Sequence, residues 1–340
     1  MNKKTSNLLL FSIVIIFLSL RLAFITQKNL WFDEIFSWNL TLGSFYEILV
    51  RTSNDIHPPL YYFVLKVWNY VVGDSVLSMR LLSAIFSTAT LFFVYPLSKK
   101  ILDRYYSYLF LVLFAVNPLN IFYSQEVRMS AMNLFLNAGA VYFLLKIIER
   151  EQLWKLYFKQ SDIYFYILFC TLALYTHYFS FFIFVVEIIF ALFVRRSGAG
   201  RTKVYLMAIS GVLLLYLAWI PTFLEQITRG QSWRSMQDLT SAGYQLINFI
   251  KDINLGLYYH YTNLQIVSYI SIFLIVIYLA ASVMSFPVKL QSTDFLIFLL
   301  VIIPVLQGLI ISVRQKVEFY RYLSIIIPFV LIFIINGISK

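Results

Sequence analysis

Long apolar segments separated by short polar ones run along the whole chain. A segment of about 20 apolar residues is long enough to cross the hydrocarbon core of a bilayer as a helix, and repeated segments of this kind are typical of an α-helical membrane protein. We therefore predict an all-α, polytopic membrane protein with a single domain over residues 1–340. The ten predicted spans are residues 8–26, 79–98, 105–122, 129–148, 163–178, 180–194, 204–221, 264–285, 294–312 and 322–338.

One apolar segment, residues 58–72, does not fit this pattern. It is only about 15 residues long and contains Lys66, so it is short for a span and suits a helix that lies in the membrane interface. If it does not cross, residues 27–77 form a long first outer loop with juxtamembrane helices. Residues 222–262 form a second long outer loop, which is a candidate for acceptor contacts because long loops are often functional.

Composition and charge agree with a membrane location. The chain is 61% hydrophobic and 13% charged, whereas soluble domains carry about 25% charged residues. The net charge of +11 is explained by basic residues in short cytoplasmic loops, which orient membrane proteins, and not by nucleic-acid binding. This distribution predicts a cytoplasmic N-terminus and a plasma-membrane location. The single cysteine, Cys170, excludes an internal disulfide.

Most of the acidic residues fall on the predicted outer side, where five polar clusters also gather. They are Asp33-Glu34, residues 55–62 with Arg80, residues 123–132, residues 174–180 and residues 318–323. Such a convergence suits a site at the boundary between lipid and water.

Each cluster alone has a simpler explanation. The acids can be a solvated pair within an aromatic belt, and His57 before two prolines can start a helix. Arg80 and Arg128 can extend to lipid headgroups. Glu187, near the middle of a span, is costly there and requires a partner that the sequence does not identify.

Taken together and in order, the motifs "FDE", "HPPLYY", "MR", "YSQEVRMSAM", "YTHYFS" and "FYRYL" resemble those of the GT-C glycosyltransferases. Within that class the chain is similar to the dolichyl-phosphate-mannose-protein mannosyltransferase superfamily (glycosyltransferase family 39) and its lipid A aminoarabinose-transferase relatives. The resemblance covers nearly the whole chain. It implies a membrane enzyme that takes a sugar from a polyprenyl-phosphate carrier on the extracytoplasmic face. It also implies that an acid of the first outer loop is the catalytic base.

Displacement at the anomeric carbon of such a donor needs a base for the acceptor hydroxyl and cations for the departing phosphate. The predicted catalytic residues are Asp33, as base, and Glu34. Arginine binds phosphate oxygens with two parallel hydrogen bonds, and the predicted phosphate-binding residues are Arg80, Arg128, Arg321 and, more weakly, Lys66. The predicted substrate-binding residues are His57, Tyr61, Tyr62, Tyr123, Glu126, His177, Tyr178 and Tyr322.

Several alternatives stay open. One displacement predicts inversion and needs no metal, although a divalent cation is a less favoured alternative. A flippase or transporter of a lipid-linked sugar is the competing function, but the charges lie at the outer rim and no repeated halves are found. The sequence does not identify the sugar, nor whether the acceptor is a lipid, a glycan or a protein.

Overall fold

The structure is a computed structural model that describes residues 3–149, 161–194, 199–229, 247, 293–314 and 323–339. Within these residues the regular elements are all helices, as predicted. The first part of the chain forms α1 (Lys3–Leu22), α2 (Phe32–Leu42), α3 (Phe45–Ser53), α4 (Leu60–Val72), α5 (Val76–Ala89), α6 (Leu91–Ser98), α7 (Arg104–Val116), α8 (Pro118–Ser124) and α9 (Ser130–Glu149). The second part forms α10 (Ser161–Thr176), α11 (Ser180–Val194), α12 (Ala199–Tyr216), η3 (Leu217–Trp219), α13 (Ile220–Arg229), α16 (Thr293–Arg314), η5 (Leu323–Ile326) and α18 (Ile327–Ile338).

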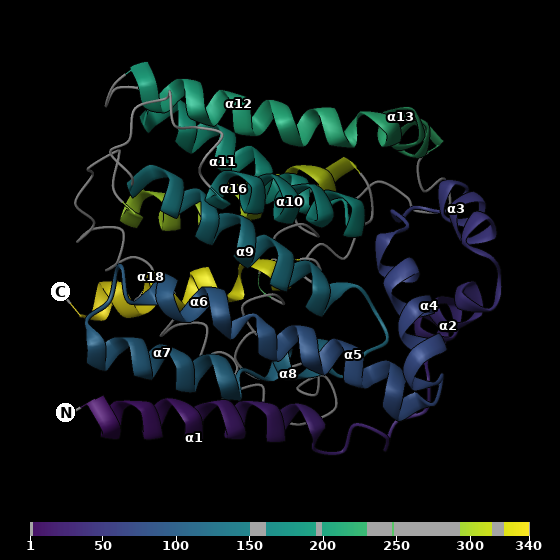
Figure 1. The fold of residues 1–340 in the computed structure, drawn as a ribbon, viewed down its shortest axis with the longest axis horizontal. Coiled ribbons are helices and arrows are strands. Elements are labelled where there is room, and N and C mark those ends of the chain that lie inside the picture. The colour runs from purple at the N-terminus through teal and green to yellow at the C-terminus, as the bar shows by residue number, and fades with distance from the viewer. Residues whose placement is uncertain are drawn as a thin grey trace.

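The long helices run side by side, and the three short helices of the first outer loop, α2, α3 and α4, gather at one end of them (Figure 1). Five helical segments of the described residues are long and apolar enough to cross a membrane, or six if the bent pair α7–α8 counts as one. The protein is therefore a multi-pass membrane protein. The number of ten spans stays a prediction, and the predicted span 264–285 lies outside the described residues, as does most of the loop 222–262.

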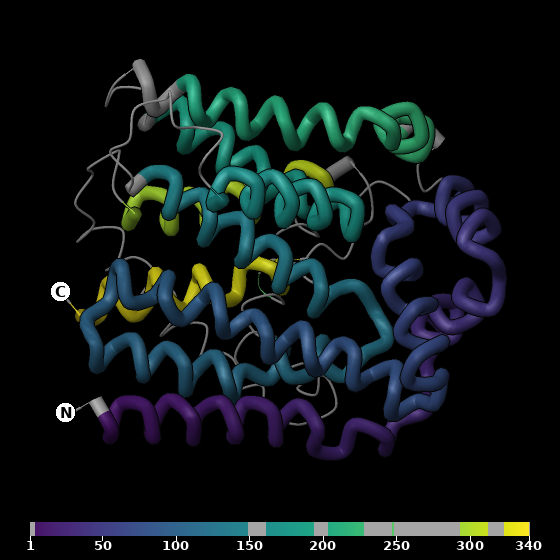
Figure 2. Tube along the Cα trace, viewed as in Figure 1, coloured from purple at the N-terminus to yellow at the C-terminus, as the bar shows by residue number. Residues whose placement is uncertain are grey.

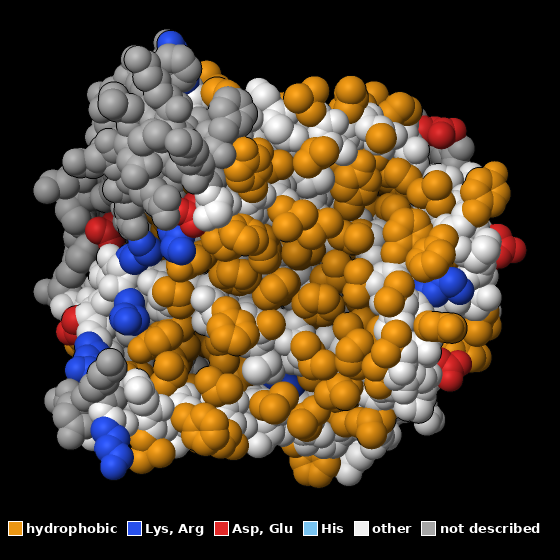
Figure 3. All heavy atoms as spheres, in the orientation of Figure 1, with side chains coloured by type: hydrophobic (Ala, Val, Ile, Leu, Met, Phe, Trp, Pro, Cys, Tyr) orange, Lys and Arg blue, Asp and Glu red, His pale blue; other side chains and the backbone are white. Residues whose placement is uncertain are grey.

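The surface supports this assignment. In Figure 3, hydrophobic side chains cover the middle of the visible face, while charged side chains gather toward its two ends. Large apolar side chains on the outside of the helices are strongly exposed, among them Phe11 (63%), Phe92 (78%) and Leu214 (69%). An apolar surface this wide is expected where lipid, and not water, is the solvent.

Buried side chains form two cores. The larger one fills the space among α1, α7, α9–α12, α16 and α18, and the C-terminal α18 packs against α7 (Figure 2). The smaller one joins the first outer loop to the start of α5 and α9, through residues such as Leu40, Tyr62, Met79 and Met132. The loop is thus held by a core of its own, which fixes the position of its side chains relative to α9.

A sharp bend of 55° separates α7 from α8, and its cause is Pro118. Proline lacks the N–H that would bond the carbonyl four residues earlier, here that of Phe114. The buried guanidinium of Arg21, from α1, donates to the carbonyls of Phe114 (3.4 Å) and Ala115 (2.8 Å) and so satisfies the exposed helix end. In return, the Gln125 amide donates to the Arg21 carbonyl (3.0 Å) at the end of α1.

These reciprocal contacts lock the segment after α8 against α1. Gln125 also donates to the carbonyls of Leu20 (3.3 Å) and Ala23 (2.8 Å). Because Gln125 immediately precedes Glu126, the contacts determine where the "YSQEVR" motif lies at the end of the helices.

The close packing of α10 against α9 depends on Gly139. A Cβ atom at this position would lie 2.3 Å from the Phe169 ring, which is itself packed against the rings of Phe93 (5.0 Å) and Phe143 (5.5 Å). We predict that Gly139→Leu destabilises the protein by about 1–3 kcal/mol through overpacking, measured as a lower melting temperature in detergent. Phe169→Ala should restore part of this loss in the double variant. A Gly139→Leu protein that melts like the wild type would contradict the packing described here.

Candidate functional site

The first two acids of the outer loop point in different directions. Trp31 precedes α2, and Asp33 and Glu34 lie in its first turn, where the positive end of the helix dipole favours carboxylates. Neighbouring residues on a helix are rotated by about 100° from each other. As a result the Glu34 side chain is buried, with 1% exposed, while the Asp33 side chain keeps 29% of its surface exposed.

The Glu34 carboxylate is fully engaged inside the protein. The Arg80 guanidinium donates to it twice, from Nε to Oε1 at 2.9 Å and from Nη2 to Oε2 at 2.8 Å. The backbone N–H groups of Val127 (2.8 Å) and Trp31 (3.3 Å) donate to the same two oxygens. This one carboxylate therefore connects the first outer loop, α5 and the "YSQEVR" segment.

Arg80 is engaged as completely as its partner. Besides Glu34, it donates to the backbone carbonyls of Ile25 (2.7 Å), Lys28 (2.9 Å) and Asn29 (3.2 Å). Its side chain is only 4% exposed. The roles predicted for Glu34 in catalysis and for Arg80 in phosphate binding stay untested predictions, but this geometry favours a structural role for both.

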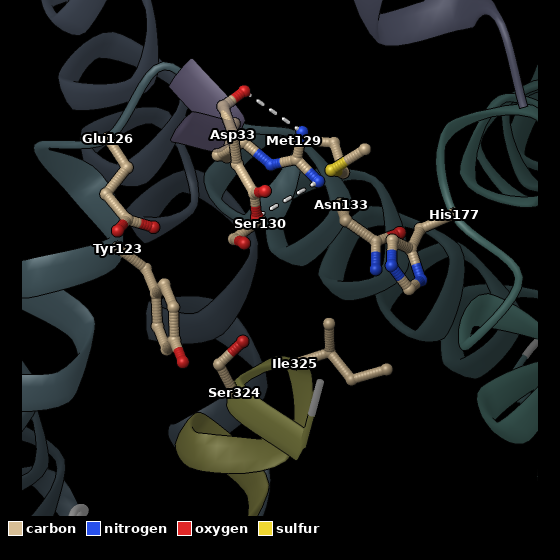
Figure 4. A pocket seen from close by; sticks show the side chains of 10 residues that line it. Asp33, Tyr123, Glu126, Met129, Ser130, Asn133, His177, Ser324 and Ile325 are labelled. Carbon is tan, nitrogen blue, oxygen red and sulfur yellow. Dashed lines mark hydrogen bonds and ion pairs between the residues drawn. The ribbon is translucent and has the colours of Figure 1, made fainter. Parts of the chain in front are cut away.

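Asp33 instead pairs with Arg128 beside a cavity that both residues line. An Arg128 Nη2 atom lies 3.8 Å from Asp33 Oδ2, and Nη1 donates to the Asp33 carbonyl at 3.3 Å and to Ser37 Oγ at 3.4 Å. The cavity is shown in Figure 4. Its lining residues are Asp33, Tyr123, Glu126, Arg128, Met129, Ser130, Asn133, His177, Ser324 and Ile325.

Five of the predicted site residues thus meet in one place: Asp33, Tyr123, Glu126, Arg128 and His177. They come from α2, from α8 and the segment that follows it, and from the turn after α10. Arg321 and Tyr322 lie outside the described residues. Ser324 and Ile325, which follow them closely in the chain, line the cavity.

His57 lies beside this group. Its ring centre is 5.5 Å from that of His177, and its Nδ1 is 3.3 Å from Asp55 Oδ2. Burial lowers the pKa of His57 below its usual value of 6.5, and the nearby charge of Arg128 lowers it further. At neutral pH the imidazole is therefore uncharged, which suits a hydrogen-bonding role and not an ion pair with phosphate.

Tyr61 and Tyr62 belong to α4 and do not line the cavity. Both are completely buried in the smaller core. Burial raises the pKa of both hydroxyls, that of Tyr62 to about 12. Neither ring lines the cavity, so stacking on a sugar is not the contact that their position favours.

Lys66 and Tyr178 lie away from the cavity. Lys66 Nζ donates to the Thr41 carbonyl at the end of α2 (2.9 Å). The Tyr178 hydroxyl bonds to Gln226 of α13 and accepts from the Trp219 indole (3.0 Å). Their predicted roles, phosphate binding and substrate binding, are untested, and their positions favour holding neighbouring helices together.

The structure also gives the partners of Glu187. In the core beside α11, the Tyr166 hydroxyl donates to Glu187 Oε2 at 3.0 Å and the Cys170 thiol lies 3.6 Å from the same oxygen. None of these three residues lines the cavity. Their contacts therefore support a structural role for the buried acid.

Sequence reasoning missed Met129, Ser130, Asn133, Ser324 and Ile325 as lining residues. Asn133 carries a signal that points to a role, because it is an amide inside an apolar predicted span, where polar groups require partners. The prediction that no metal takes part stays untested. Within the described ranges, no three His, Cys, Asp or Glu side chains gather closely enough to hold a metal ion.

The Glu34–Arg80 pair can be tested by removing its negative charge. We predict that Glu34→Gln destabilises the protein by about 3–5 kcal/mol, because it leaves a buried guanidinium without its carboxylate. The exposed Glu47 of the same loop caps α3 through Ser44, and Glu47→Gln is the matched control that should leave the melting temperature nearly unchanged. Equal melting temperatures for Glu34→Gln and the wild type would show that the pair is dispensable.

Comparisons with known proteins agree with the resemblance seen in the motifs. Residues 56–221 match the model of the dolichyl-phosphate-mannose-protein mannosyltransferase family. The structure resembles that of apo ArnT from Cupriavidus metallidurans, with 12% identity and a TM-score of 0.55, over 84% of this chain and 50% of ArnT.

A second similar structure is the apo oligosaccharyltransferase of Archaeoglobus fulgidus, with 10% identity and a TM-score of 0.62, over 98% of this chain and 50% of that enzyme. The same oligosaccharyltransferase in complex with Zn and sulfate gives 12% identity and a TM-score of 0.54, over 97% of this chain and 48% of the other.

The chain spans about half the length of these solved structures, and at such low identity the likeness concerns the fold alone. No curated protein matches the chain in sequence. The family match and the two structural neighbours nevertheless agree with the motifs, and they confirm the predicted resemblance: this is a membrane protein of the GT-C fold, and residues 56–221 are similar to the dolichyl-phosphate-mannose-protein mannosyltransferases.

Proposed function

We propose that the protein is a glycosyltransferase that moves a sugar from a polyprenyl-phosphate carrier to an acceptor hydroxyl on the extracytoplasmic face of the membrane. One observation carries this proposal. Asp33 and Arg128, which are 95 residues apart in the chain, face each other at one cavity at the loop end of the helices. A base and a phosphate-binding cation at one site are what transfer from a sugar phosphate requires.

Asp33 is the base in this mechanism. It removes the proton from the acceptor hydroxyl while the acceptor oxygen forms a bond to the anomeric carbon. The bond between that carbon and the phosphate oxygen breaks at the same time, and its electron pair leaves with the polyprenyl phosphate. A single displacement of this kind inverts the anomeric configuration.

Glu34 is less suited to be the base. Its two oxygens already accept four hydrogen bonds, which stabilise the ionised form and leave no access for an acceptor. Asp33 keeps 29% of its side-chain surface exposed and lines the cavity. Of the two adjacent acids, Glu34 therefore has a structural role and Asp33 a catalytic one.

Arg128 holds the leaving group. Its guanidinium is planar and permanently charged, so it can bind two phosphate oxygens at once. Because its guanidinium also contacts Asp33, Arg128 can set the distance between the bound phosphate and the base. Glu126 also lines the cavity, so its carboxylate can contact a hydroxyl of the acceptor or the sugar.

The mechanism needs no metal ion, and we extend the proposal to metal independence. The acceptor, whether lipid, glycan or protein, and the sugar are left open, since the described residues identify neither. A flippase or transporter of the same lipid-linked sugar is the competing function, and it requires no catalytic base.

The decisive experiment compares Asp33→Asn with Asp74→Asn in an assay that measures polyprenyl phosphate released from polyprenyl-phosphate sugars. Asp74 lies in the same loop, where it accepts from the Trp38 indole on the surface (3.1 Å), and makes a matched control. We expect Asp33→Asn to lower turnover about 10²–10⁴-fold, with donor binding retained, and Asp74→Asn to have little effect.

Addition of EDTA to the wild-type assay tests the metal. Full activity in EDTA is expected, and loss that Mg²⁺ or Mn²⁺ restores would refute metal independence. An Asp33→Asn protein with wild-type turnover would overturn the proposed mechanism, and a wild type that moves the donor across a vesicle without cleaving it would favour the transporter.

A further inference from the structure

Asn133 lies at the cavity in a position that no motif predicted. It belongs to the first turn of α9, shortly after Arg128 and Ser130, and only 3% of its surface is exposed. Figure 4 shows its side chain pointing from α9 toward the cavity, beside that of His177. An amide buried at the rim of an apolar helix is costly unless its polar atoms have partners.

The hydrogen bonds that the Asn133 side chain makes all go to its oxygen, Oδ1. Its Oδ1 accepts from Ser180 Oγ at 2.6 Å and from Asn137 Nδ2 at 2.9 Å. Asn137 Nδ2 also lies 3.1 Å from Ser180 Oγ, so the three side chains form a closed cluster between α9 and α11.

This cluster decides which way the amide faces. If the amide were rotated by half a turn, its NH₂ group would meet the NH₂ group of Asn137, and two donors would oppose each other. The oxygen therefore faces the cluster and the nitrogen faces away from it. No hydrogen bond from that nitrogen occurs among the described residues, although the side chain is buried.

The surroundings of the nitrogen favour an anion. The cavity is lined by Met129, Ser130 and Asn133 at the start of the 20-residue helix α9, where unpaired N–H groups and the helix dipole attract negative charge. Arg128 adds a full positive charge directly before this helix. A neutral donor fixed in place next to these groups suits a phosphate oxygen.

We propose that Asn133 Nδ2 donates a hydrogen bond to the phosphate group of the lipid-linked donor, at the N-terminus of α9 and beside Arg128. This inference rests on the proposed function and deepens it. It makes Asn133 a substrate-binding residue, and it makes Asn137 and Ser180 positioning residues that act through its oxygen.

The variant Asn133→Asp tests this directly. The substitution preserves the shape and an oxygen that can accept from Asn137 and Ser180, but it turns the second atom from a donor into an anionic acceptor. Repulsion and the lost hydrogen bond should raise the KM for the donor and the inhibition constant of polyprenyl phosphate by roughly ten- to a hundredfold. The KM for the acceptor should change little.

Two further proteins keep the test decisive. Asn39→Asp adds the same charge at an exposed site of α2 and should leave all constants unchanged. Asn133→Ala removes the donor without adding charge and replaces Asn133→Asp if the latter does not fold. It should raise the same two constants by a smaller factor.

Inorganic phosphate serves as a second inhibitor in the same assay. If the inhibition constants of inorganic phosphate and of polyprenyl phosphate rise in parallel in Asn133→Asp, the contact is to the phosphate group itself. If only the inhibition by polyprenyl phosphate weakens, the contact is to the lipid chain, and the assignment to phosphate is wrong.

Failure of this inference can be told from failure of the proposed function. If the wild type transfers sugar and Asn133→Asp has wild-type constants for donor and polyprenyl phosphate, Asn133 is structural only, and the inference is overturned. If the wild type neither releases polyprenyl phosphate nor is inhibited by it, the proposed function fails first, and this inference falls with it.

Discussion

The buried pair Glu34–Arg80 is the interaction on which the arrangement of the site depends. Through four hydrogen bonds to one carboxylate, it joins the start of α2, the start of α5 and the backbone at Val127. Without it, the first outer loop would rely on the smaller apolar core and on single hydrogen bonds, such as those from Arg128 to Asp33 and Ser37. Because Val127 lies next to Arg128, and Glu34 next to Asp33, the structural pair sets the distance between the pair that faces the cavity.

The same logic extends into the helices. Arg21 donates to the carbonyls at the end of α7, and Gln125 donates to the Arg21 carbonyl at the end of α1. These contacts bring Tyr123 and Glu126 to the cavity wall. On the opposite side, the Asn133–Asn137–Ser180 cluster orients one amide. In each case a buried, hydrogen-bonded polar group sets the direction of a neighbouring group that lines the cavity. This pattern is consistent with a site that is largely preformed before its substrates arrive.

Much of this arrangement could be predicted from the sequence, because apolar periodicity and loop charge are local signals. They predicted the helices and the separate short helix at residues 58–72, found as α4. Motif order then brought Asp33, Glu126, Arg128 and His177 to one face. What sequence could not separate was Asp33 from Glu34, since the direction of adjacent side chains depends on what packs against α2. The positions of Lys66 and Tyr178 could not be predicted from the sequence either, because they follow from contacts with Thr41 and Gln226 that only the fold creates.

The proposed transfer reaction requires the first-loop end of the molecule to face away from the cytoplasm. Labelling of single cysteines in intact cells measures this orientation most directly. In a Cys170→Ser background, Tyr46→Cys reports on α3 and Tyr105→Cys on the opposite end, at the start of α7. Both positions are more than 70% exposed. A membrane-impermeant thiol reagent should label position 46 in intact cells and position 105 only after permeabilisation. Labelling in the reverse order would put the cavity on the cytoplasmic side and contradict the account.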